Sequence, residues 1–176
     1  MRYRRAKESG ATYFFTVNLA ERHRNLLTDS ANVLRAVVRT VQRRHPFHID
    51  AIVILPDHLH AVWTLPPGDA DYPVRWALIK AGFSRRIPRG EQSSASRVAK
   101  GERGIWQRRY WEHMIRDETD YARHMDYVHY NPVKHGYVRV AAEWPYSSIH
   151  RYIEAGTLPS DWGGCGHGED GNFGER

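Results

Sequence analysis

Two histidines, His58 and His60, are separated by one residue within a mostly apolar segment, residues 52–65. In a β-strand, side chains at i and i+2 point to the same face, so both imidazoles would meet in one small volume. Imidazole is the commonest metal-binding side chain, and two of them on a rigid element need only one or two further ligands. The spacing therefore predicts part of a metal site, although a half-buried, hydrogen-bonded pair would have the same sequence.

Tyr127 is the second residue whose position suggests chemistry. It lies in residues 117–130, where helical periodicity places three side chains on an apolar stripe that can face a sheet: Tyr121, Met125 and Val128. A phenol, with an ordinary pKa of about 10, is a weak nucleophile at neutral pH. It suits phosphoryl transfer because an aryl phosphate stays reactive enough for a later hydroxyl to reverse it. A divalent ion on His58 and His60 could polarise a phosphate while Tyr127 attacks.

The sequence leaves alternatives open around this tyrosine. Tyr127 could instead pack from an amphipathic helix, and Tyr130, three residues on, is a rival nucleophile. Residues 131–136 begin with Asn131 and a proline and end with a glycine. That order is typical of an N-cap, a first helical position and a terminator, so we expect a short separate turn of helix there.

The elements that would carry these residues follow from hydrophobic periodicity. Strand patterns cover residues 11–19, the two halves of 47–65 around a turn at Pro56 and Asp57, and 105–116. Helical patterns run from Thr28 or Asp29 to about His45, through Trp76, Ile79 and Phe83, and over 117–130. This order predicts an α+β protein with a ferredoxin-like split βαβ fold, in which helices cover one face of an antiparallel sheet. A helical extension would follow at the C-terminus, and residues 88–104, without periodicity, should form a mobile basic loop.

Composition limits the size and the partners of the fold. With 176 residues and 41% hydrophobic content, the chain suits one domain, residues 1–162, followed by a glycine-rich tail, residues 163–176, that we expect to be disordered. Lys and Arg outnumber Asp and Glu by 26 to 20, which favours a polyanionic partner such as nucleic acid. The single Cys165 excludes an internal disulfide. Neither a signal peptide nor a membrane span is evident, so we expect a cytoplasmic protein without a membrane partner.

Two motifs resemble those of a known family. Residues 55–63, Leu-Pro-Asp-His-Leu-His-Ala-Val-Trp, and residues 126–136, Asp-Tyr-Val-His-Tyr-Asn-Pro-Val-Lys-His-Gly, are similar to the motifs of single-tyrosine HUH transposases, and more narrowly of REP-associated tyrosine transposases. Residues 13–18, 105–113 and 144–148 are further similar segments. The resemblance extends over about residues 3–162.

This resemblance implies a specific reaction. His58 and His60 would bind Mg or Mn, and Tyr127 would cleave single-stranded DNA to give a 5′-phosphotyrosine and a free 3′-hydroxyl that can rejoin DNA without ATP. Asn131 stands one helical turn after the tyrosine, where this type of family places a third metal ligand. The DNA would be a REP-type palindromic hairpin, bound by a bacterial protein active at the nucleoid. Whether the chain works as a monomer or a homodimer stays open.

Basic and aromatic residues supply candidate DNA contacts. Those expected to contact phosphates are Arg4, Arg5, Arg85, Arg86, Arg108, Arg109 and Lys134, and those that could stack on bases are Tyr3, Trp63, Trp106 and Tyr110. Two other functions are compatible with these features: a catalytically inactive relative that only binds structured nucleic acid, and a metal-dependent phosphodiesterase that uses activated water. The presence of His58, His60 and Tyr127 together favours the transposase-like enzyme.

Overall fold

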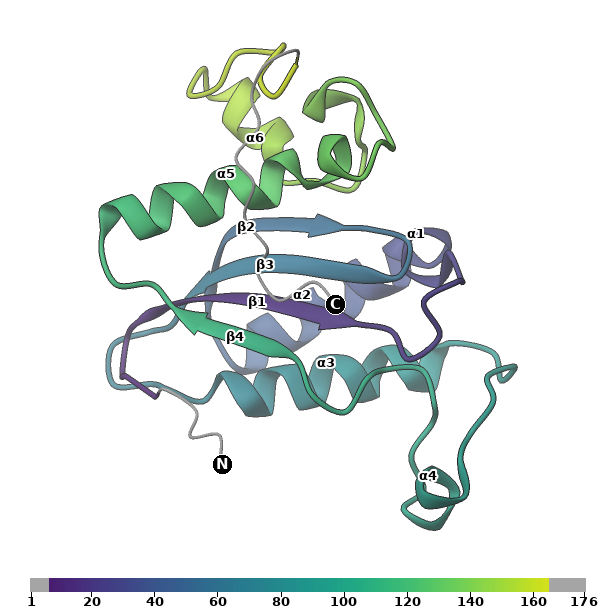
Figure 1. Cartoon of the computed structure of the whole chain (residues 1–176). Coiled ribbons are helices and arrows are strands. Elements are labelled where there is room, and N and C mark those ends of the chain that lie inside the picture. The colour runs from purple at the N-terminus through teal and green to yellow at the C-terminus, as the bar shows by residue number, and fades with distance from the viewer. Residues whose placement is uncertain (1–6, 165–176) are drawn as a thin grey trace.

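A four-stranded antiparallel sheet organises the molecule, for which a computed structural model describes residues 7–164 (Figure 1). The strands are β1 (Thr12–Asn18), β2 (His48–Ile54), β3 (His58–Thr64) and β4 (Trp111–Met114), and their order across the sheet is β2-β3-β1-β4. The predicted hairpin joins β2 to β3, while β1 lies between β3 and β4. The α+β class and the split βαβ order are therefore confirmed.

Six α-helices and one short 3₁₀ helix accompany the sheet in the described residues. They are α1 (Leu26–Asp29), α2 (Ala31–Arg44), α3 (Tyr72–Arg86), α4 (Ala95–Ala99), α5 (Glu118–Lys134), η1 (Ala141–Glu143) and α6 (Ile149–Glu154). The last two form the expected C-terminal extension, which continues the β2 side of the sheet through hydrogen bonds from the Ile54 and Ser148 amides. Within residues 7–164, no helix has the length and apolar character needed to cross a membrane.

Helices cover both faces of the sheet rather than one, which corrects one detail of the predicted fold. Tyr13, Phe15 and Val17 of β1 pack with α2 and α3, whereas Phe14 packs on the other face with Val128 of α5 (Figure 1). The reason lies in β1 itself, because six of its seven residues are buried and both of its faces are largely apolar. A strand of this kind has to be covered on each side.

The close packing of α2 on α3 depends on one glycine. A Cβ placed on Gly82 would lie 2.8 Å from a methyl carbon of Val37, closer than side-chain atoms approach. The indoles of Trp63 and Trp76 stack below this contact at 4.2 Å between ring centroids. These contacts fix one face of the sheet and leave the other face for α5.

Helix α5 runs through Pro132 to Lys134, so the separate turn predicted for residues 131–136 is not formed. Asp117 caps the start of the helix by accepting a hydrogen bond from the Asp120 amide. Pro132 costs only one backbone hydrogen bond this close to the end, and both Asn131 and Pro132 are buried. Burial of this last turn therefore overrides the local signal. The helix ends at Lys134, and Gly136, which follows the C-cap His135, has a φ of 72° that suits glycine.

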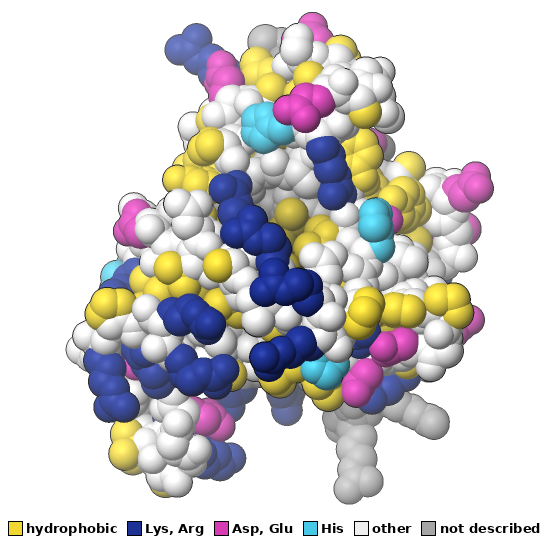
Figure 2. Space-filling model, turned by 180° about the vertical axis from the view of Figure 1, so that it is seen from behind, with side chains coloured by type: hydrophobic (Ala, Val, Ile, Leu, Met, Phe, Trp, Pro, Cys, Tyr) yellow, Lys and Arg dark blue, Asp and Glu magenta, His cyan; other side chains and the backbone are white. Residues whose placement is uncertain are grey.

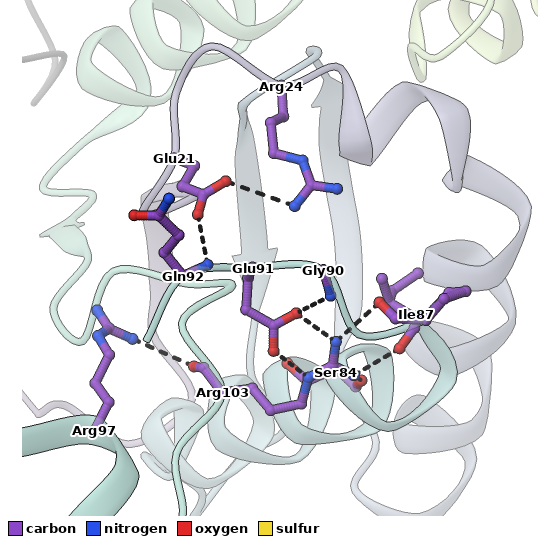
Figure 3. Close-up of polar contacts among 10 residues, drawn as sticks. Glu21, Arg24, Ser84, Ile87, Gly90, Glu91, Gln92, Arg97 and Arg103 are labelled. Atoms are coloured by element: carbon purple, nitrogen blue, oxygen red, sulfur yellow. Dashed lines mark hydrogen bonds and ion pairs between the residues drawn. The ribbon is translucent and has the colours of Figure 1, made fainter. Parts of the chain in front are cut away.

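The segment predicted as a mobile basic loop, residues 88–104, contains α4 and is held by Arg103 (Figure 3). The guanidinium donates to the carbonyl oxygens of Ser84, Ile87 and Pro88 and to both carboxylate oxygens of Glu91. This pairing with Arg103 lowers the pKa of Glu91 to about 2. The carbonyl partners come from the end of α3 and the residues after it, so hydrophobic periodicity could not reveal them.

Two other boundaries differ from expectation. Strand β4 covers only four residues of the strand predicted over 105–116, and Trp106 reaches the sheet through a single bridge to Leu19. Of the tail predicted over 163–176, residues 165–176 lie outside the described part of the chain, so its disorder stays a prediction.

Candidate active site

The two histidines of the motif share one face of β3, as their spacing predicts. His58 lies opposite Asn18 and His60 opposite Thr16 in the β1–β3 pairing. Their ring centroids are 5.0 Å apart, and the side chains are 1% and 0% exposed, respectively. The sheet therefore presents two imidazoles from a rigid and dry position.

A hydrogen bond to Nδ1 orients each imidazole. The carboxylate of Asp57 lies 2.7 Å from Nδ1 of His58, and the hydroxyl of Thr16 lies 2.9 Å from Nδ1 of His60. In contrast, Nε2 of His58 is buried and has no hydrogen-bond partner among the described residues. A metal-binding histidine commonly has this arrangement, in which one nitrogen is held by a carboxylate or hydroxyl and the other faces the metal.

Asp57 is in turn fixed by Arg22, whose Nε donates to the second carboxylate oxygen at 2.6 Å. Burial alone would raise the pKa of Asp57, but the hydrogen bonds from His58 and Arg22 outweigh it and lower the pKa to about 2. From the sequence alone, Asp57 is expected only in a turn. Its position next to His58 was a usable signal, whereas the contribution of Arg22, thirty-five residues away in sequence, was not.

Helix α5 brings Tyr127 against the histidine pair within the same chain. The ring centroid of Tyr127 lies 5.2 Å from that of His60 and 6.0 Å from that of Phe14. Lys134, two turns later, donates a hydrogen bond to the Tyr127 hydroxyl at 3.1 Å, and its ammonium lies 4.7 Å from the ring centroid. The structure thus places a phenol, a cation and two imidazoles together.

The remaining residues of this helix are divided between the site and the core. Asn131 is fully buried one turn after Tyr127 and lies inside α5 rather than at an N-cap. The next turn brings His135 to 5.3 Å from His58 between ring centroids. Tyr130, the rival nucleophile, is half-buried beside Gly163, where a Cβ would lie 3.3 Å from its ring.

The basic residues predicted to bind DNA are widely distributed. Arg4 and Arg5 lie outside the described residues, whereas Arg85, Arg86, Arg108, Arg109 and Lys134 are exposed. Arg86 donates to the Gly82 carbonyl and Arg108 pairs with Glu102, so both are partly engaged within the fold. Arg85 and Arg108 line a groove of about 790 Å³ between α3 and α4. Figure 2, seen from the α2 and α3 side, shows Lys and Arg side chains spread across this face.

The aromatic residues predicted to stack on bases are mostly structural. Trp63 and Trp106 are 1% and 6% exposed and belong to the core between the sheet, α2 and α3, so this prediction is wrong for both. Tyr110 is half-buried, and Tyr3 lies outside the described residues. Their burial was not evident from sequence because aromatic residues suit a sheet core and a base platform equally.

A second cluster of potential metal ligands, His113, Asp120 and His124, joins β4 to α5. Its ligand atoms lie within 4.8 Å of one another, a separation that could hold an ion. The groups also bind each other: Nε2 of His113 lies 2.8 Å from Asp120, whose same oxygen accepts from the Arg116 amide at 3.0 Å. Hydrogen bonds from Arg116 and His113 outweigh the effect of burial and lower the pKa of Asp120 strongly. This cluster is not predictable from the sequence, because it depends on how α5 docks on the sheet.

The comparisons with known proteins agree with the sequence motifs. No protein-family model matches the chain. An Escherichia coli K12 protein named REP-associated tyrosine transposase is 45% identical over 162 residues, covering 92% of this chain and 90% of the relative. A Haemophilus influenzae protein with the same family designation is 48% identical over 163 residues, covering 92% and 93%.

A solved structure extends the likeness to three dimensions. It is described as a REP-associated tyrosine transposase bound to a REP hairpin, and it superposes with a TM-score of 0.85 at 44% identity, covering 100% of this chain and 98% of that one. Identity of this degree over nearly the full length of both proteins confirms the resemblance predicted from the motifs. The chain belongs to the REP-associated tyrosine transposases.

Proposed function

We propose that this protein is a metal-dependent endonuclease and strand transferase that cleaves single-stranded DNA at REP-type hairpins through a 5′-phosphotyrosine intermediate. The observation that carries the proposal is the position of Tyr127, whose ring lies 5.2 Å from that of His60 within one chain. Nucleophile and metal ligands have to meet on one phosphate, and here a helix and a strand of the same fold hold them together.

The residues present fit a divalent ion. His58 and His60 would hold it through Nε2, because Nδ1 of each ring is hydrogen-bonded to Asp57 or Thr16. Asn131, buried on α5, is the proposed third ligand. Imidazole and amide ligands are compatible with Mn, and Mg would retain more of its waters. When bound, the ion would polarise the scissile phosphate and offset its charge.

Tyr127 would supply the nucleophile, with Lys134 as its electrostatic partner. As the bond from the phenol oxygen to phosphorus forms, the bond from phosphorus to the 3′-oxygen breaks; the phenol proton passes to water, and the 3′-oxygen is protonated from water. The Lys134 ammonium, 3.1 Å from the phenol oxygen, favours the negative charge that develops there. In the reverse step it would stabilise the departing phenolate, so one cation serves both cleavage and rejoining.

The choice of DNA rests on the family and on charge. The relative bound to a REP hairpin covers 100% of this chain at 44% identity, so we propose a hairpin of this class as the substrate. The net charge of +6 is suited to a phosphate backbone. Arg85 and Arg108, which line the α3–α4 groove, are proposed backbone contacts together with the exposed Arg109 and Lys134.

Incubation of the protein with a labelled single-stranded REP-type hairpin and Mn or Mg, followed by denaturing gel electrophoresis, tests the proposal. We expect a covalent protein–DNA adduct that is absent with a chelator and in Tyr127→Phe, but is retained in Tyr130→Phe as the matched control. Cleavage without an adduct, unchanged by Tyr127→Phe, would instead support a phosphodiesterase that uses water. Hairpin binding with no cleavage would support the catalytically inactive alternative.

A further inference from the structure

Two aromatic side chains stand out by their exposure. Trp111 and Tyr137 are 44% and 45% exposed, whereas the other Trp, Tyr and Phe side chains of residues 7–164 are buried or half-buried. A single exposed aromatic residue is common on protein surfaces. These two differ because strand pairing places Trp111, and ring contacts place Tyr137, beside the histidine pair.

Trp111 flanks the site on the β4 side. It lies opposite Thr16 in the β1–β4 pairing, and Thr16 is the residue hydrogen-bonded to His60. Residues directly opposite each other in an antiparallel pair point to the same face with Cβ atoms about 5 Å apart. His60, Thr16 and Trp111 therefore form one row across β3, β1 and β4, and Trp111 points to the face that carries the site. Helix α5 packs on the β2 and β3 side of that face (Figure 1), and the Trp111 side chain on β4 stays exposed.

Tyr137 flanks the site on the opposite side, toward β2. It directly follows Gly136, just beyond the end of α5, and the ring of His135 lies between it and His58, with centroids at 5.9 Å and 5.3 Å. Beneath it, Trp144 stacks at 5.2 Å with an interplanar angle of 27°. Trp144 is itself fixed by a hydrogen bond from its indole nitrogen to the Ile54 carbonyl of β2. Tyr137 is thus an aromatic ring that is supported by Trp144 and is still 45% exposed.

Basic side chains lie near the Tyr137 end of this pair. Lys134 lies on the turn before Tyr137, and Arg22 and its ion-pair partner Asp57 both lie close enough to interact electrostatically with the Tyr137 hydroxyl. Aromatic planes interleaved with cations are the means by which proteins hold unpaired bases and their phosphates. A second copy of the chain is a less suitable occupant, because the two rings flank a polar site instead of forming one contiguous apolar patch.

We propose that Trp111 and Tyr137 stack on unpaired nucleobases that lie on the two sides of the scissile phosphate. The strand would then cross the sheet from β4 toward β2, with its phosphate over His58 and His60. This inference rests on the proposed function, since it takes the histidine pair as the position of the phosphate. It adds the two side chains that would bind the DNA strand on either side of the scissile phosphodiester bond.

Binding of fluorescent hairpin DNA with unpaired flanks, measured by anisotropy on the Tyr127→Phe background, tests the inference without cleavage. We expect Trp111→Ala and Tyr137→Ala each to weaken binding roughly 5- to 150-fold, the range for loss of one base–aromatic stack. Trp111→Phe and Tyr137→Phe, which keep a ring, should bind nearly as the parent does. Leu78→Ala, at a similarly exposed residue (37%) on α3, is the matched control and should have no effect.

An abasic scan identifies the contacted nucleotides. When the base that stacks on Tyr137 is removed, Tyr137→Ala should cause no further loss of DNA affinity. Removal of a base at a different position should have the same result for Trp111→Ala. Losses that are additive at every position, or alanine variants that bind as the parent does, would overturn the inference. So would a loss of binding that follows dissociation of a dimer in sedimentation velocity. If stacking is found but the Tyr127 protein forms no adduct, the proposed function fails while the base contacts stand.

Discussion

Two clusters of histidines lie on the same face of the sheet, and they differ in what their ring atoms bind. Phe14 separates them, with its ring centroid 5.7 Å from His60 and 4.8 Å from His124. At the first cluster, Asp57 and Thr16 hold Nδ1 of the two rings, and Nε2 of His58 has no partner among the described residues. A ring nitrogen of this cluster therefore stays able to bind an ion.

At the second cluster, the carboxylate between the two histidines is already engaged. One oxygen of Asp120 accepts from the ring of His113 and from both the backbone and side chain of Arg116. A cation here would have to compete with the guanidinium. Residue type and proximity are therefore not sufficient for a metal site, because the hydrogen bonds already made decide which atoms can bind an ion. We interpret the first cluster as chemical and the second as a structural link between β4 and α5.

The largest effect should come from the histidines themselves. We expect His58→Ala and His60→Ala each to lower the rate of adduct formation more than about 100-fold, since loss of partners behind a metal ligand already costs about 10- to 100-fold. His113→Ala should leave the rate per folded molecule nearly unchanged. Single-turnover gel assays with Mn give the rates, and a comparable loss in His113→Ala would contradict the division between the clusters.

Asp57 and Asp120, which contact the rings of His58 and His113, should have different effects when they are replaced. Asp57→Asn should weaken Mn binding by about 10- to 100-fold while the protein stays folded, because His58 loses the carboxylate that orients it. Asp120→Asn should leave Mn affinity unchanged and lower the free energy of unfolding by about 2 kcal/mol, through loss of charge-assisted hydrogen bonds. Calorimetric titration and urea unfolding of both variants measure the two effects. Weaker Mn binding in Asp120→Asn, with unchanged Mn binding in Asp57→Asn, would instead make the second cluster the metal site.

A smaller effect is expected at Lys134. Lys134→Ala should slow adduct formation by about 10-fold and move the rising limb of its pH profile upward, because the phenolate loses its neighbouring cation. Lys134→Arg should recover part of the rate. Hairpin affinity measured in parallel separates this role from a phosphate contact, since a contact with the backbone alone would alter binding and its salt dependence without shifting the pH profile.

The smallest effect concerns stability in acid. The pKa of Asp57 is lowered to about 2 in the folded protein from 3.8, so its contribution is fully present above pH 3.8 and is lost as the pH falls through 2. The contribution is on the order of 1–2 kcal/mol. Unfolding free energies measured between pH 5 and 2 should therefore fall less steeply in Asp57→Asn than in the parent. Parallel curves would show that the ion pair with Arg22 does not persist in solution.

Local pattern was sufficient for the main framework. The i, i+2 spacing of His58 and His60 placed both rings on one face, and the helical stripe of residues 117–130 placed α5 on the sheet. The order of elements gave the split βαβ topology, because each strand and helix has a strong period of its own. The shared position of Tyr127 and the histidines was expected from the family motifs rather than from periodicity.

What could not be predicted depends on contacts between distant residues. Pro132 indicated a helix boundary, but burial of Asn131 and Pro132 extends α5 beyond it. Arg103 holds the loop before it through carbonyl groups that have no sequence signature. Helix α5 covers the second face of the sheet because both sides of β1 are apolar and need burial. Exposed Tyr137 and buried Trp63 are both aromatic residues, and only the packing around them separates their roles.

Identification of the residue that becomes linked to the DNA tests most directly whether Tyr127 is the nucleophile. The adduct formed with Mn is trapped, digested with nuclease and trypsin, and analysed by fragmentation mass spectrometry of residues 124–134, the peptide between Arg123 and Lys134 that contains both Tyr127 and Tyr130. We predict a 5′-linked nucleotide on Tyr127 alone, and none when His58 is replaced by alanine. A nucleotide on Tyr130, or an adduct that forms equally well in His58→Ala, would contradict the account.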